Sequence, residues 1–140
     1  MKRVFVDTSA WYGYARRDDP SHEPVAQALE RWEGRLVTSN FVFDEVVTLA
    51  RARLGHCAAL RLGEALRDPE VVDLVGLLPE DEDEAWEYFK RQRDKAYSFT
   101  DCASFALMRR LHIPVAIATD RHFQQAGFDV EPEPKGFLVK

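Results

Sequence analysis

Cysteine is scarce in this chain, and long apolar runs are absent from it. Only Cys57 and Cys102 occur among the 140 residues, too few and too far apart for a disulfide framework or a thiolate metal site, and we expect both to be buried small side chains. The apolar stretch after Lys2 and Arg3 stops at Asp7, far short of the core of a secretory signal. No window approaches the ~18 consecutive apolar residues of a membrane span. These absences predict a protein of the reducing cytoplasm with no membrane segment.

An excess of positive charge, which a nucleic-acid partner favours, is also missing. The chain has 19 Lys and Arg against 24 Asp and Glu, a formal net charge of −5, which at first argues against an anionic partner. Four of the acids account for most of this excess, since the chain without them has 20 acids and 19 bases; these are Asp7, Glu45, Asp101 and Asp120. If those four bind divalent cations, net charge does not exclude a nucleic acid.

Short β-branched and aromatic runs alternate with helical segments along the chain. Strands are predicted at residues 3–7, 36–38, 71–78, 115–118 and 128–130. Helix starts are predicted at Thr8 and Ser9, Pro24, Ser39 or Asn40, Pro79 and Ser98. This alternation predicts an α/β fold with a parallel sheet covered by helices on both faces. The length fits a single domain over residues 1–140, with residues 131–140, which contain two prolines and a glycine, as a loosely held tail.

Two aspartates follow predicted strands. Asp7 ends the first strand, and Asp120 comes directly after the run at 115–118 and Thr119. Open α/β sheets bind ligands at the carboxyl ends of their strands, so neighbouring strands would bring both carboxylates into one crevice. The alternative is that each aspartate caps the helix that follows it. Neither position is specific by itself.

Glu45 interrupts a strongly apolar helix, and its neighbour Asp44 serves as an internal comparison. On that helix Asp44 shares a face with Thr48 and Arg51, as a solvated acid does, whereas Glu45 lies beside the apolar stripe. An acid in that setting needs a partner. We therefore expect a ligand role for Glu45, the alternative being a structural acid satisfied by a distant partner.

Asp101 opens a helix of small and apolar residues, where it could simply cap the first-turn amides. Capping and catalysis are compatible, because exposed amides at a helix N-terminus can also bind a phosphate. Carboxylates that converge in a partly dry site repel one another and lose hydration, so such a cluster requires protons or cations. The four acids together predict a divalent metal site.

Four segments in order along the chain form a combined pattern: VDTSA at 6–10, residues 39–46 with Glu45, YSFTDCAS at 97–104, and ATDRHF at 118–123 followed by Gly127 and Phe128. In this pattern the chain resembles the PIN-domain family, and within it the small VapC-type toxins of toxin–antitoxin pairs. The resemblance implies a three-layer α/β/α fold with a five-stranded parallel sheet in the order 3-2-1-4-5. It therefore makes the strands that end in Asp7 and Asp120 neighbours.

The resemblance also implies an activity and its residues. It makes Asp7, Glu45 and Asp101 the acidic core with Asp120 as the fourth acid, all catalytic and metal-binding, and gives Ser9 and Thr119 supporting polar positions. It implies a Mg²⁺- or Mn²⁺-dependent endoribonuclease, a homodimer, and a cognate antitoxin protein as partner. Mg²⁺ and Mn²⁺ accept carboxylate oxygens and keep several waters, and a bound water can hydrolyse a phosphodiester.

Two other functions compete with a metal-dependent endoribonuclease. A non-cleaving RNA-binding or scaffolding PIN module would be favoured by the loss of a core acid, which the chain does not show. A phosphoaspartyl hydrolase with Asp7 as nucleophile requires a second acid where the chain has Ser9. The ribonuclease is therefore the preferred interpretation.

Basic residues and histidines are less informative. Candidates for holding an RNA backbone are Arg16, Arg17, Arg51, Arg53, Arg109, Arg110 and Arg121. Most are expected to be ordinary surface charges, and Arg121 is singled out because it adjoins Asp120. The four histidines lack the i, i+4 spacing of a zinc pair, so none is given a catalytic role.

Overall fold

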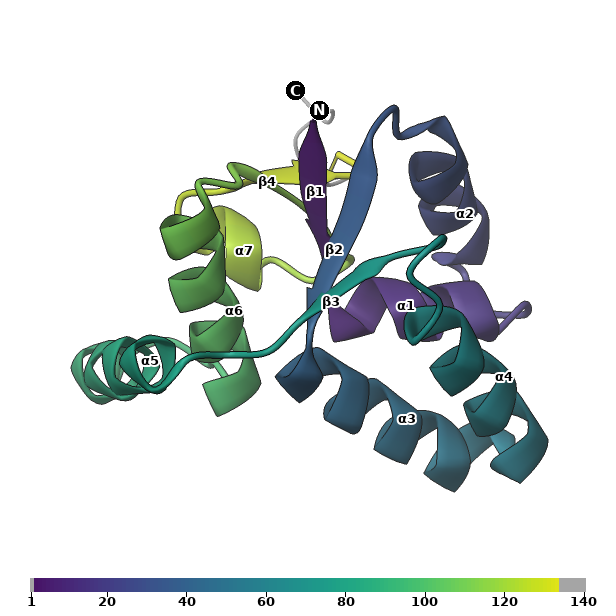
Figure 1. Cartoon of the computed structure of the whole chain (residues 1–140), viewed down its shortest axis with the longest axis horizontal. Coiled ribbons are helices and arrows are strands. Elements are labelled where there is room, and N and C mark those ends of the chain that lie inside the picture. The colour runs from purple at the N-terminus through teal and green to yellow at the C-terminus, as the bar shows by residue number, and fades with distance from the viewer. Residues whose placement is uncertain (1, 134–140) are drawn as a thin grey trace.

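The computed structural model describes residues 2–133, in which strands and helices alternate (Figure 1). The strands are β1 (Arg3–Val6), β2 (Arg35–Ser39), β3 (Asp73–Val75), β4 (Val115–Ile117) and β5 (Asp129–Glu131). The helices are α1 (Thr8–Ala15), α2 (His22–Arg31), α3 (Asn40–Leu54), α4 (His56–Leu66), α5 (Pro79–Arg91), α6 (Phe99–Leu111) and α7 (His122–Gln125). The single domain predicted over residues 1–140 stays a prediction, and residues 134–140 of the predicted tail lie outside the described residues.

All five strands pair in parallel in the order β3-β2-β1-β4-β5. In Figure 1, α1 to α4 lie to the right of the sheet and α5 to α7 to its left, so the predicted α/β/α fold and strand order are confirmed. Strand order reverses between β1 and β4, where Val6 aligns with Ile117. This reversal is the kind of position at which open α/β sheets bind their ligands.

Helix α6 anchors the left-hand layer because it is buried on nearly all sides. Its residues Asp101 to Met108 are all buried, and Phe105 lies at its centre. The Phe105 ring packs edge-on against Tyr97 and Phe123, with ring centroids 5.1 and 5.0 Å away, and stacks on Phe128. Aromatic pairs at such separations add stability beyond the area they bury. This packing holds the amino end of α6 against the sheet.

Three local expectations need correction. Strand β3 is shorter than the predicted 71–78, because the Leu77 amide donates to the Asn40 side chain instead of extending the ladder. Glu131 belongs to β5 rather than to a loose tail, and its carbonyl accepts the Ala118 amide at 3.0 Å. Cys102 is buried as expected, whereas Cys57 is exposed.

Within residues 2–133, no helix combines the length and apolarity needed to cross a membrane.

Residues 80–84 are all acidic, and one of them, Asp81, is buried. The Asp81 side chain is 4% exposed and accepts hydrogen bonds from the Leu78 amide and the Arg110 guanidinium. Burial raises the pKa of Asp81, but the Arg110 and Leu78 bonds outweigh it and hold that pKa below its usual value. This pair joins α5 to α6 and removes Arg110 from the groups available to bind RNA.

Candidate metal and active site

The four predicted acids line one open cavity of about 630 Å³, which lies at the carboxyl edge of the sheet. Asp7 follows β1, Glu45 lies on α3, Asp101 on α6, and Asp120 between β4 and α7. Chain segments that are far apart in sequence therefore place their carboxylates around one space. Both Asp7 and Asp101 are almost fully buried.

Asp7 is the N-cap of α1, which was the alternative interpretation of its position, and Thr8 and Ser9 lie inside the helix instead of capping it. Its Oδ2 accepts the Ser9 hydroxyl at 2.8 Å and the Ser9 amide at 3.2 Å. The Ser9 hydroxyl oxygen in turn accepts the Thr119 amide at 3.0 Å. Ser9 thus ties Asp7 to the segment that leads to Asp120, and Thr119 takes part through its backbone.

Asp101 forms the predicted capping box at the start of α6. Its amide donates to the Ser98 hydroxyl, while its Oδ2 accepts the Ser98 amide, both at 3.0 Å. In both Asp7 and Asp101 the capping bonds go to Oδ2, and Oδ1 has no hydrogen-bond donor among residues 2–133. Each carboxylate therefore has one oxygen that holds the backbone and one oxygen left for another ligand.

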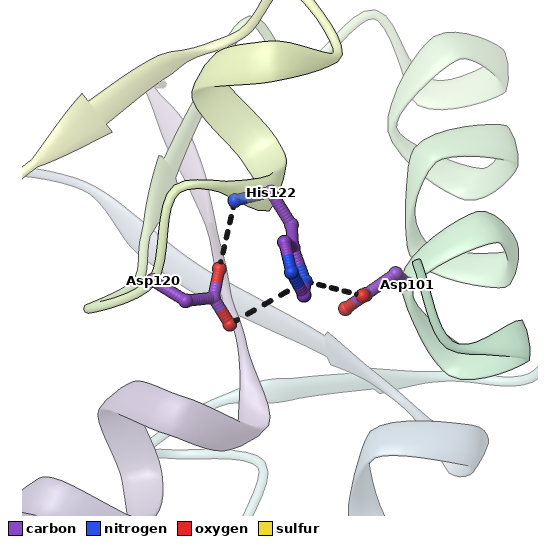
Figure 2. Close-up of side chains that lie close together, drawn as sticks. All are labelled: Asp101, Asp120 and His122. Atoms are coloured by element: carbon purple, nitrogen blue, oxygen red, sulfur yellow. Dashed lines mark hydrogen bonds and ion pairs between the residues drawn. The ribbon is translucent and has the colours of Figure 1, made fainter. Parts of the chain in front are cut away.

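His122 lies between Asp101 and Asp120, as Figure 2 shows. Its Nδ1 is 2.7 Å from Asp101 Oδ2 and 3.8 Å from Asp120 Oδ2, and its amide donates to Asp120 Oδ1 at 3.1 Å. Ligand atoms from these three residues lie within 4.8 Å of one another. The sequence did not predict a role for His122, because the four histidines lack the spacing of a metal-binding pair on one helix. The only available signal was its place two residues after Asp120, inside the last family segment.

Glu45 has the partner that its position requires. Its Oε1 accepts the Thr8 hydroxyl at 2.5 Å, so a neutral hydroxyl from α1 takes the place of a distant base. Asp44 is exposed as expected, but it also lines the cavity. The two neighbouring acids therefore differ less in position than the helical phase predicted.

Arg121 does not share the cavity with Asp120. Its exposed side chain lines a separate hollow on the other side of Asp120, together with Pro20 and Pro24. Adjacency in sequence pointed to the acidic cavity, but Arg121 does not line it, whereas Asp120 lines both that cavity and the separate hollow. The predicted contact of Arg121 with RNA stays a prediction.

The site favours protons or cations, as the crowding of acids predicts. Burial raises the pKa of Asp7 to about 7, with further contributions from Asp120 and Asp101 that the Ser9 bonds only partly oppose. Burial also raises the pKa of Asp120, with His122 opposing the shift. A divalent cation would relieve the same repulsion. The donors present are mostly carboxylate oxygens with one imidazole, a set that fits Mg²⁺ or Mn²⁺.

The parallel sheet and the acidic cavity at its carboxyl edge define a class of α/β protein, and comparison with known families identifies that class. The model of the PIN domain matches residues 4–129. The chain belongs to the PIN-domain family.

Relatives of this chain include VapC proteins. VapC20 of Mycobacterium tuberculosis, named a 23S rRNA-specific endonuclease, is 38% identical over 131 residues, which cover 93% of this chain and 99% of that protein. Its crystal structure, described as that of a sarcin–ricin loop cleaving toxin, superposes with a TM-score of 0.85 over 89% of this chain and 95% of that one, at 36% identity. A VapC ribonuclease of Archaeoglobus fulgidus is 28% identical over 86% of this chain and 78% of its own length. The predicted resemblance to VapC-type toxins is thereby confirmed.

The raised pKa of Asp7 predicts how stability depends on pH without metal. Because the folded state holds this proton more tightly than the unfolded state, the free energy of unfolding falls as pH rises from the usual value of 3.8 to about 7. Asp7→Asn cannot ionise and lacks this loss. In EDTA the variant should match the native protein near pH 4 and be more stable than it at pH 8, as measured by urea unfolding. A stability difference that does not change with pH would contradict the raised pKa.

Proposed function

We propose that this protein is a Mg²⁺- or Mn²⁺-dependent endoribonuclease. The observation that supports this most directly is the convergence of Asp7, Glu45, Asp101 and Asp120 on one cavity, with the pKa of Asp7 raised to about 7. The 38% identity to VapC20, which extends over 93% of this chain, supports an endonuclease on independent grounds. A non-cleaving RNA-binding module is less favoured, because such a module has no need to keep costly buried acids together.

Each site residue has a proposed task. Asp7 and Asp101 use their free oxygens to hold the cation, and Asp120 completes the site from the other side, with His122 orienting Asp101 and Asp120. When bound, the cation would lower the pKa of a water and offset charge on the phosphate. Glu45, fixed by its bond from Thr8, is placed to orient or deprotonate the attacking water.

The proposed reaction is simple hydrolysis. An oxygen–phosphorus bond forms from water and the bond from phosphorus to the 3′ oxygen breaks, so the products have a 5′-phosphate and a 3′-hydroxyl. The 2′-hydroxyl of the substrate is not needed for this chemistry, so any preference for RNA must come from shape and contacts. Since VapC20 is named for 23S rRNA, a hairpin from that RNA is the first substrate to test.

Partners and location follow from the same proposal. We infer that a cognate antitoxin controls the protein and that it works in the cytoplasm, where RNA is available and Cys57 and Cys102 stay reduced. We also infer a homodimer. Its support is an exposed aromatic pair on α5, where Trp86 is 50% and Phe89 39% exposed and the rings stack at 5.8 Å. Contiguous exposed apolar surface of this kind marks interaction sites.

Metal binding should be visible without any RNA. Millimolar Mg²⁺ or Mn²⁺ is expected to raise the melting temperature, since a ligand at 100 times its Kd adds about 2.7 kcal/mol to the stability of the folded state. Asp101→Asn should reduce the rise by removing a ligand. Asp83→Asn, which changes an exposed acid on α5, should leave it intact. A native melting temperature that is indifferent to either metal would contradict the proposed site.

Cleavage should depend on the cavity acids and on metal. Asp101→Asn and Glu45→Gln are expected to slow cleavage of the 23S rRNA hairpin by about 10²–10³-fold, the usual effect of removing a group that stabilises the transition state. Asp83→Asn should cleave at the native rate, and EDTA should stop cleavage. Sequencing of the RNA ends measures both the rate and the predicted 5′-phosphate. Equal activity of Asp101→Asn and Asp83→Asn would refute the assignment.

The aromatic pair on α5 should decide the oligomeric state. Trp86→Lys places a charge in the middle of the proposed interface and is expected to shift the protein from dimer to monomer in sedimentation equilibrium. Val71→Lys is the control, since Val71 is an apolar residue of similar exposure, 41%, before β3. A native protein that is monomeric at micromolar concentration, or a dimer that Trp86→Lys leaves unchanged, would rule out this interface.

A further inference from the structure

The acidic cavity leads along α3 into a second hollow. Thr48 lines both spaces, and the second hollow, of about 410 Å³, lies between α3 and α4. Its apolar floor includes Phe43, Val47 and Ala59. Gly63 forms part of the α4 wall, and because it has no side chain, no Cβ covers the edge of the Phe43 ring, which would lie 3.8 Å away. The floor is therefore apolar, and it includes the edge of an aromatic ring.

The rim of this second hollow contains exposed basic groups. Arg51 and Arg67 line it, with Glu64 as the one acid among the lining residues. The Arg67 guanidinium lies over the Phe43 ring, 5.7 Å from its centroid. Arg51 has no ion pair within 4 Å among residues 2–133. Both guanidinium groups therefore remain available to an anionic ligand.

Ion pairs also separate Arg51 from three of the other arginines considered as RNA contacts. Arg16 pairs with Asp18, Arg109 with Glu84, and Arg110 with Asp81, so these three guanidinium groups already have an anionic partner. Arg51 is farther along the same helix as Glu45, by about 9 Å at 1.5 Å per residue. That distance corresponds to roughly two to three stacked nucleotides at 3.4 Å each.

We propose that the second hollow binds a nucleotide of the RNA substrate close to the cleaved bond, and this rests on the proposed ribonuclease function. An apolar floor with an aromatic ring is suited to an unstacked base, which single-stranded RNA can supply. Arg51 and Arg67 on the rim are suited to the phosphates on either side of that base. The continuity through Thr48 places this nucleotide on the same strand as the phosphate in the acidic cavity. Helix α3 thus contributes to both cleavage and substrate selection.

The first test compares the effect on KM of replacing arginines on or next to α3 and α4. Arg51→Gln and Arg67→Gln should each raise KM for the 23S rRNA hairpin by about 3–10-fold, as expected for lost phosphate contacts, with kcat unchanged. Arg61→Gln, on the other side of α4 and lining a different hollow, should leave KM unchanged. Affinities for the same labelled RNA in EDTA, measured by fluorescence anisotropy, should follow the same order. Native KM values in Arg51→Gln and Arg67→Gln would overturn this inference, whereas a native protein that cleaves no RNA would overturn the proposed function itself.

A second test distinguishes RNA from a protein occupant. Leu60 is 54% exposed on the rim, so charged substitutions there are compatible with folding. If the hollow binds RNA, Leu60→Glu should weaken RNA binding by repulsion and Leu60→Lys should strengthen it. If both variants leave RNA affinity unchanged and weaken binding of the antitoxin or of a second copy of the chain, the hollow is a protein-docking site and the inference is wrong.

Discussion

Repulsion among buried carboxylates is the constraint on which the rest of this structure depends. Asp7 and Asp101 lose most of their hydration, and Asp120 faces both, so the ionised site is destabilising unless something offsets its charge. Hydrogen bonds from Ser9, Ser98 and His122 offset part of it. The remainder keeps the pKa of Asp7 near 7. The proposed divalent cation would stabilise such a site because it would replace repulsion with attraction.

Apolar packing around the site offsets the destabilisation of the folded state that this repulsion causes. Helix α6 is buried along most of its length and its Phe105 contacts four other aromatic rings, so the amino end of the helix cannot move away from the sheet to relieve the charge. The capping bonds have the same effect locally. Because capping occupies Oδ2 of Asp7 and of Asp101 and leaves Oδ1 free, helix capping and ligand binding are two uses of one side chain. This compatibility was expected for Asp101, and the geometry extends it to Asp7, for which capping had been the alternative.

Helix α3 contributes side chains to both the acidic cavity and the second hollow. Its first turns bring Glu45 to the acidic cavity, and its later turns bring Arg51 to the second hollow. In the proposed function, opposite charges on one helix therefore face the same ligand, the acid towards the cation and the base towards the RNA phosphates. This separation also explains why a net charge of −5 is a poor guide to the partner of this protein. What matters is how charge is distributed over the surface that meets the ligand.

The sequence by itself determined the class of fold, the approximate positions of the strands, and the four acids that share a cavity. These features follow from hydrophobic periodicity and from segments whose order matches the family, which are local properties of the chain. Only the tertiary structure decided which neighbouring groups join those acids. His122 and Asp44 both line the acidic cavity, whereas Arg121 lines a separate hollow. Asp81, one of the five acids at 80–84, is buried in a pair with Arg110. The physical reason is that the direction of a side chain depends on how its helix or turn packs against distant elements, and residues adjacent in sequence can point into different spaces.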